Sequence, residues 1–275
     1  MTEARSSTPN PSTSNPTIAR SIDLNCDLGE SFGAWTMGAD AAVMPWITSA
    51  NIACGFHAGD PDTMRRTLQL AVRAKVAVGV HVSLPDLAGF GRREMRVSPD
   101  ETYAMTLYQI GALAGFARAA GTRLRHVKPH GALYNMAARD ALLAAAIAQA
   151  VRDFDARLIL VGLCASELTR AGRNLGLDVG HEAFMDRRYE NDGSLTPRSE
   201  PDAVIADVDA AVAQALAIAT RGEVTTRSGA TLTLSADTLC VHGDRSDAAL
   251  FARCLHEGLK AAGISVRAPG IERAA

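Results

Sequence analysis

Five short apolar segments of this chain each end in charged or imidazole side chains, and a turn follows each of them. Carboxylates and imidazoles serve as general acids, general bases and metal ligands, and a lysine can bind an anion. In a parallel α/β barrel all strand ends of one kind open on a single face, where the active site lies. The sequence therefore predicts an enzyme, or an enzyme subunit, with its polar groups gathered at that face. The groups are Asp27, Glu30, His57, Asp60, His81, Lys128, His130, His242 and Asp244.

The first segment, IDLNCDLGE (22–30), contains Asn25, Asp27 and Glu30. Carboxylates at the end of a strand can bind a divalent cation, act as a general base or cap the following turn. Capping is the simplest interpretation of this segment alone. The other segments end in imidazoles that could share a site with these carboxylates, which favours a chemical role.

Two histidines follow in the second and third segments. His57 lies in GFHAGD, where the flanking glycines allow the backbone to approach a ligand, although a hydrogen bond to Asp60 in the same loop is an alternative. His81 lies in the apolar run VGVHVSL, where a histidine is commonly a buried, hydrogen-bonded group. Together with Asp27 and His130 it could instead form a two-histidine, one-carboxylate set, which suits zinc or another transition metal.

The tetrapeptide Lys128-Pro-His130-Gly is the most distinctive local feature. Residues two apart in an extended chain point to the same face. A lysine deep at a strand end requires an anionic partner, which could be a substrate carboxylate, a phosphate or Asp27. The alternative is a surface lysine that lies beyond the strand.

The last segment, TLCVHGD (238–244), ends in His242 and Asp244. A carboxylate can orient an imidazole and raise its basicity, which suits a general base or a metal ligand. Asp244 could equally be a turn residue. The loop at 186–189 contains Arg187, whose guanidinium could hold a carboxylate, although a solvated run of charges is an equally good explanation.

The segments alternate with helical patterns along the chain. Asp60 can cap a helix whose first residue is Pro61, and Ser98 with Glu101 forms a capping box. Seven β-α units with largely apolar strands favour a closed, TIM-like (β/α) barrel, and a doubly wound open sheet is the alternative. Beyond the five segments, strands are expected at 156–164 and 177–186. Helices are expected at 60–75, 98–121, 140–154, 165–176, 201–222 and 246–263.

Composition narrows the class of protein further. The chain has 275 residues with 47% hydrophobic residues and a formal net charge of −2, so nothing in its charge indicates a nucleic-acid or membrane partner. Residues 1–18 are rich in Ser, Thr, Pro and Asn, which predicts a disordered extension without the apolar core of a secretion signal. Residues 19–275 are expected to form one catalytic barrel domain. The five cysteines show no C-x-x-C spacing, which favours a reduced, cytoplasmic protein.

Some familiar nucleotide and hydrolase motifs are absent. The chain contains no G-x-x-x-x-G-K-[ST] phosphate loop and no G-x-S-x-G nucleophile elbow, and GFGRRE lacks the spacing of a dinucleotide-binding fingerprint. If ATP is used, this chain has no standard pocket for it.

An ordered series of motifs resembles the LamB/YcsF family from about Ile22 to Val266. The series includes IDLNCDLGE, SANIACGFHAGD, GVHVSLPD, FGRREM, RHVKPHGALYN, EAFMDRRY, DGSLTPRS and LCVHGD. The resemblance implies the seven-stranded barrel of the glycoside hydrolase/deacetylase superfamily. It implies the A subunit of an ATP-dependent 5-oxoprolinase, which cleaves 5-oxo-L-proline to L-glutamate together with subunits B and C. The alternatives are a stand-alone metal-dependent deacetylase or amidase that acts on a small carbohydrate, and a non-catalytic subunit that only binds substrate.

The looser similarity to metal-dependent deacetylases makes Asp27, His81 and His130 the metal-ligand candidates, with His57 and His242 as substitutes. ATP and a divalent metal ion are the expected cofactors. Lys128 or one arginine of the pair Arg187 and Arg188 would hold the substrate carboxylate, and Asp27 or His242 would activate the attacking water. The catalytic candidates are Asp27, Lys128, His242 and Asp244. The substrate-binding candidates are Asn25, Glu30, His57, Asp60 and Arg187.

Overall fold

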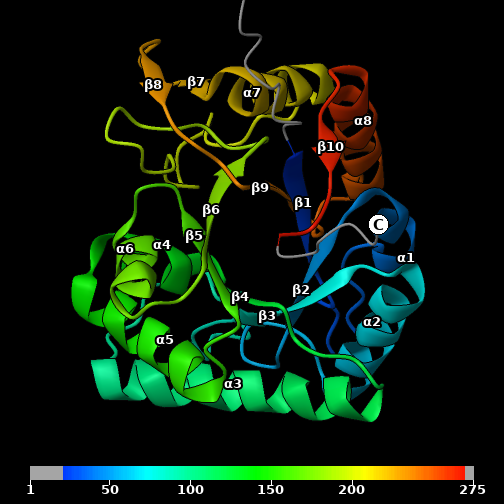
Figure 1. The fold of residues 1–275 in the computed structure, drawn as a ribbon, viewed down its shortest axis with the longest axis vertical. Helices are drawn as coiled ribbons and strands as arrows, with labels where there is room; N and C mark the ends of the chain where they lie inside the picture. Colours follow the sequence, from blue (N-terminus) through cyan, green and yellow to red (C-terminus); the bar gives the residue numbers. More distant parts are fainter. Residues whose placement is uncertain (1–20, 270–275) are drawn as a thin grey trace, which may run out of the picture.

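A computed structural model describes residues 21–269 of the chain. Seven parallel strands follow the order β1-β2-β3-β4-β5-β6-β9, and β9 pairs with β1, so the sheet is closed into a barrel. Figure 1 shows the strands around a central axis with the helices outside them. The predicted closed barrel is confirmed, and the open sheet is excluded. The predicted disordered extension at residues 1–18 lies outside the described residues.

The barrel strands are short and separated by helical crossovers. They are β1 (Ser21–Leu28), β2 (Ser49–Ala53), β3 (Ala77–Val82), β4 (His126–Pro129), β5 (Ile159–Leu163), β6 (Val179–Phe184) and β9 (Thr238–Val241). The helices are α1 (Asp40–Val43), α2 (Pro61–Ala74), α3 (Pro99–Ala119), α4 (Gly131–Arg139), α5 (Ala141–Phe154), α6 (Glu167–Asn174), α7 (Val208–Arg221) and α8 (Ala248–Ala261), with a 3₁₀ turn, η1, at Met44–Trp46. A hairpin of β7 (Glu223–Thr225) and β8 (Thr231–Thr233) lies between α7 and β9, and β10 (Ser265–Val266) pairs with the start of β1.

Local sequence signals fix several helix starts. The Asp60 side chain accepts a hydrogen bond from Thr63 N and Pro61 begins α2, as predicted. The capping box of Ser98 and Glu101 is present at the start of α3. These ends determine where the polypeptide leaves the rim and returns along the outside of the barrel.

Two elements differ from the predicted pattern. The helix predicted over 201–222 begins only at Val208, because Asp207 caps it and a bridge between Arg187 and Val204 holds the preceding residues extended. The strand predicted over 125–134 ends at Pro129, and α4 follows directly. The buried residues of α4, among them Leu133 and Ala137, recur at helical spacing.

The interior of the barrel is polar, whereas the layer between the strands and the helices is apolar. Leu24 and Cys26 of β1 belong to the hydrophobic core. Asp23 and Asn25 alternate with them and form hydrogen bonds inside the barrel, where both contact Thr238. A hydrogen-bonded polar interior therefore lies directly beneath the functional groups at the rim.

None of the helices within residues 21–269 is long and apolar enough to cross a membrane.

Candidate functional site

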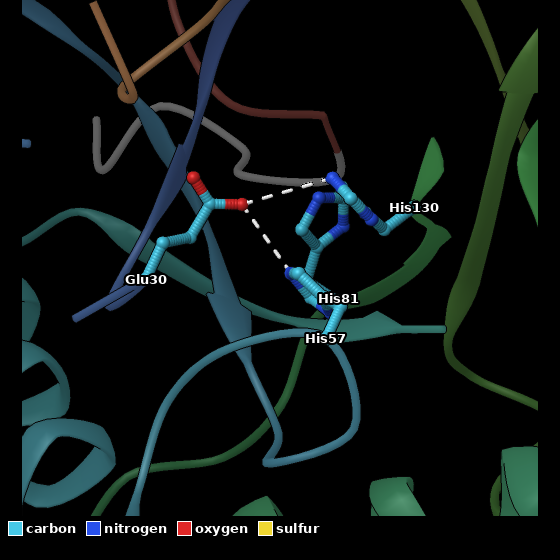
Figure 2. Close-up of side chains that lie close together, drawn as sticks. All are labelled: Glu30, His57, His81 and His130. Atoms are coloured by element: carbon cyan, nitrogen blue, oxygen red, sulfur yellow. Dashed lines mark hydrogen bonds and ion pairs between the residues drawn. The ribbon is translucent and has the colours of Figure 1, made fainter. Parts of the chain in front are cut away.

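Three histidines and one glutamate meet at the carboxyl ends of β1 to β4. Glu30, His57, His81 and His130 are all buried, and one ligand atom from each lies within 4.8 Å of the others. Figure 2 shows Glu30 facing His57 and His130, and its Oε1 lies 3.3 Å and 3.9 Å from their Nε2 atoms. The rings of His57 and His130 are stacked with centroids 3.9 Å apart. We call these four residues the rim cluster.

Each histidine of the rim cluster keeps one ring nitrogen without a hydrogen bond. These buried atoms are Nδ1 of His57, Nε2 of His81 and Nδ1 of His130. The Nδ1 of His81 lies 2.9 Å from the carbonyl oxygen of Lys128, which places the proton on Nδ1 and leaves Nε2 as an acceptor. Burial lowers the pKa of His57 and of His130 well below the ordinary value, which favours the neutral rings that ligate metals.

These observations fit a divalent metal ion. Buried polar atoms normally have partners, so the unpartnered ring nitrogens indicate room for a ligand, and the Nε2 atoms of His57 and His130 face the carboxylate of Glu30. Imidazole nitrogens with one carboxylate form a donor set typical of zinc and related transition metals. Of the metal candidates from the sequence, His81 and His130 belong to the cluster. His57 was predicted as a substitute ligand and lies in the cluster, whereas Asp27 lies beside it. Glu30 was predicted only as a substrate-binding residue, and its position makes it a ligand candidate as well.

Asp27 lies beside the rim cluster and is held by the interior of the barrel. Its Oδ2 is 3.2 Å from His81 Nε2, and its Oδ1 accepts hydrogen bonds from Asn51 Nδ2 at 2.8 Å and Lys128 Nζ at 2.9 Å. Burial alone would raise the pKa of Asp27, but its contacts with His81 and Lys128 outweigh this effect and the pKa lies well below the ordinary value. The carboxylate is therefore ionised and fixed in orientation.

The ammonium of Lys128 is enclosed by protein groups. It lies 2.9 Å from Asp27 Oδ1, 2.8 Å from Glu182 Oε1 and 3.1 Å from Cys240 Sγ, and its side chain is 2% exposed. Asp27, Cys240 and His242 form a second group of possible metal ligands, but the ammonium lies among them and supplies the positive charge. The sequence left three anionic partners open for Lys128: a substrate carboxylate, a phosphate or Asp27. In the structure, Asp27 contacts its ammonium.

Glu182 was missed by the sequence analysis. Its Oε1 accepts hydrogen bonds from Lys128 and from Asn25 Nδ2, and the residue is completely buried. A signal was available, because a glutamate within the apolar run HEAF of a predicted strand requires a buried partner. Asn25, predicted to bind substrate, lies below the rim with hydrogen bonds to Glu182 and Thr238.

His242 is oriented by an aspartate other than the predicted one. Its Nδ1 lies 2.9 Å from both carboxylate oxygens of Asp186, whereas Asp244 forms an ion pair of 2.6 Å with Arg92. Burial would raise the pKa of Asp186, but its contact with His242 prevails and lowers it. Sequence proximity favoured Asp244, yet the structure places Asp186, in the loop after β6, beside His242.

A cavity of about 1210 Å³ joins these groups. Asp27, His81, Lys128, His130 and His242 line it, and so does Arg187. Asp60 lies apart from it, because its carboxylate caps α2 and accepts a hydrogen bond from Gly33 N. Candidates from five strands therefore meet in one space, whereas Asn25, Glu30, His57, Asp60 and Asp244 do not line it.

Comparison with known proteins identifies the group to which the chain belongs. Residues 22–273 match the LamB/YcsF family. The chain belongs to the LamB/YcsF family. A LamB/YcsF relative from Methylococcus capsulatus, named as the A subunit of 5-oxoprolinase, is 62% identical over 92% of this chain and 97% of its own length. A relative of the same name from Bacillus subtilis is 55% identical over 92% of this chain and 98% of its own.

A solved structure of this family has the same fold. The lactam utilization protein from Thermus thermophilus is 48% identical, with a TM-score of 0.85 over 90% of this chain and 99% of that one. The resemblance that the sequence motifs predicted is thus confirmed for the LamB/YcsF family.

Proposed function

We propose that this chain is the A subunit of an ATP-dependent 5-oxoprolinase, a hydrolase that cleaves the cyclic amide of 5-oxo-L-proline to give L-glutamate together with subunits B and C. The observation that carries the proposal is a cavity at the strand ends that is lined by two histidines of the rim cluster, His81 and His130, together with Asp27 and His242. The names of relatives at 55–62% identity and of the Thermus thermophilus protein supply the substrate class.

A divalent cation in this proposal is held by the rim cluster, Glu30, His57, His81 and His130. When bound, such an ion polarises a carbonyl oxygen or lowers the pKa of a bound water. The carbonyl oxygen of Lys128 orients His81 through Nδ1, and Asp27 adds a second carboxylate 3.2 Å from His81 Nε2. Lys128 is a positioning residue, because its ammonium keeps Asp27 ionised and its donors are directed at protein atoms.

His242 is the group that best fits a general base for the attacking water. Asp186 accepts the proton of Nδ1, which leaves Nε2 as the basic nitrogen in a residue that lines the cavity. Asp27 is less suited to this task because a carboxylate with a strongly lowered pKa is a weak base. The proposal therefore selects His242 from the two candidates that the sequence left open.

The proposed reaction requires ATP because the cyclic amide is difficult to open. Opening a five-membered lactam is unfavourable near neutral pH, and phosphorylation of the amide oxygen would give a better electrophile. The chain lacks a phosphate loop, so we assign nucleotide binding at least in part to subunits B and C. We place the enzyme in the cytoplasm, where ATP is available and where its free cysteines would stay reduced.

The direct test is the formation of glutamate from 5-oxo-L-proline and ATP by this chain assembled with subunits B and C. Replacement of His242 by Gln should lower turnover by about 10²–10⁴-fold, because the attacking water loses its base. His256→Gln is the matched control, since His256 lies on α8 and contacts the carbonyl oxygen of Trp46 away from the cavity. Circular dichroism would verify that both variants are folded.

Turnover of His242→Gln close to that of the wild type would refute the assignment of the base. Hydrolysis of an acetylated sugar by this chain alone, with metal and without nucleotide, would support the deacetylase alternative. If substitutions in the cavity weakened substrate binding and left turnover unchanged, the chain would be a substrate-binding subunit.

A further inference from the structure

Arg187 is a buried cation that forms no ion pair with any residue of 21–269. The residue is 4% exposed, and its guanidinium donates hydrogen bonds only to carbonyl oxygens, those of Ala203 at 3.3 Å and Thr196 at 2.6 Å. Its neighbour Asp186 directs both carboxylate oxygens at His242. Burying an uncompensated charge is costly, so a guanidinium of this kind at a cavity wall indicates an anion that is bound from outside the chain.

A second guanidinium lines the same cavity. Arg198 is exposed and makes no hydrogen bond or ion pair with any residue of 21–269, and it belongs to the loop that Arg187 anchors through the carbonyl of Thr196. Burial and the nearby charge of Arg198 lower the pKa of Arg187 to about 10. Two cations that repel each other beside a cavity are stabilised when a multiply charged anion lies between them.

Arg92 is a third arginine that lines the cavity, but Asp244 already neutralises its charge. Its guanidinium forms an ion pair with Asp244 and lies 4.8 Å from the centre of the Phe90 ring. Asp186 and Asp244 offset part of the positive charge, but neither Arg187 nor Arg198 forms an ion pair with a residue of 21–269. Together the two guanidiniums match an anion of two charges better than a single carboxylate.

We propose that Arg187 and Arg198 form a subsite for a phosphoryl group at the cavity wall next to His242. The inference deepens the proposed function and rests on it for the identity of the group, since an ATP-coupled cleavage of an amide generates phosphoryl groups. The cavity of about 1210 Å³ has room for a ligand larger than a single five-membered ring. The phosphoryl group belongs either to a phosphorylated substrate or to a nucleotide, and both present the same tetrahedral anion.

The test is calorimetric titration of the full chain with inorganic phosphate, in samples with and without prior treatment with a chelator. Phosphate should bind in both samples, and Arg198→Gln should weaken binding by about 10-fold or more, because a charge-assisted contact is lost. Arg118→Gln is the matched control, since Arg118 is exposed on α3 and does not line the cavity. Arg187→Gln should show the same loss as Arg198→Gln if it folds. If Arg187→Gln does not fold, Arg198→Gln still decides the test, because it removes no hydrogen bond within residues 21–269.

Equal phosphate affinity of the wild type and Arg198→Gln would overturn the subsite, as would acetate binding as tightly as phosphate, which would indicate a carboxylate clamp. A non-hydrolysable ATP analogue then separates the two sources. Tighter binding of the analogue than of phosphate assigns the subsite to a nucleotide, and binding no tighter assigns it to a phosphorylated substrate. Glutamate formation is not the readout here, so failure of this inference is distinguishable from failure of the proposed reaction.

Discussion

Lys128 illustrates how a single residue links the interior of the barrel to its rim. Its ammonium lies between the carboxylates of Asp27 and Glu182, and each of these residues is buried. Replacement by Met would leave two buried carboxylates without their cation. We expect Lys128→Met to lower the free energy of unfolding by about 3–5 kcal/mol, measured by urea denaturation.

Lys260→Met provides the matched control for this prediction, because Lys260 is exposed at the end of α8. The double variant Lys128→Met/Glu182→Gln should recover part of the lost stability, since one of the two stranded charges is removed. If Lys128→Met unfolded at the same urea concentration as the wild type, the buried ion pairs would not have the role assigned here.

At this scale the sequence predicted which residues approach the site better than it predicted their partners. The convergence of His57, His81 and His130 follows from their positions at the ends of parallel strands. The pairing of His242 with Asp186 in place of Asp244 depends on which strands are neighbours in space, and β9 pairs with β6 although 52 residues separate Asp186 from Thr238 in the chain. Such a contact cannot be read from local spacing.

At the scale of elements, the loop after β3 supports the rim cluster through Gly91. This glycine has φ of +64°, and a Cβ there would approach His57 Cβ to 2.7 Å and His130 Nδ1 to 2.8 Å. Gly91→Ala should therefore displace the stacked imidazoles and weaken zinc binding by at least about 10-fold, measured by competition with a chromophoric chelator.

Gly115→Ala is the control for this loop. Gly115 lies in α3 with nothing within 4 Å of its Cβ position, so alanine there should leave zinc affinity unchanged and stabilise the protein by up to about 1 kcal/mol. Unchanged zinc affinity in Gly91→Ala would show that the loop does not position the histidines.

The elements themselves were predictable to different degrees. The capping signals at Asp60 and Ser98 fixed the starts of α2 and α3, because caps are local interactions. The start of α7 was placed too early, since the bridge from Arg187 to Val204 is a tertiary contact that holds a stretch with helical composition in an extended form. The β7–β8 hairpin was not predicted. Its strands are short and partly exposed, so their apolar pattern in the sequence is weak.

At the scale of the complete barrel, closure of the sheet brings residues from distant parts of the chain together at one site. Glu30 and His242 are separated by most of the sequence, yet the pairing of β1 with β9 brings both strand ends to the same rim. The apolar strands and the alternation with helices predicted this closure. The polar interior, with Asp23, Asn25 and Glu182, was not predicted, because each of these residues is isolated in sequence and meets its partners only when the barrel closes.

The decisive measurement is the metal content of the full chain after equilibration with zinc and dialysis. We expect about one tightly bound zinc per chain, its loss in His81→Ala/His130→Ala, and its retention in His256→Ala. A wild-type chain that retains no zinc, or a double variant that retains as much as the wild type, would contradict the convergence of the rim cluster on a single metal site.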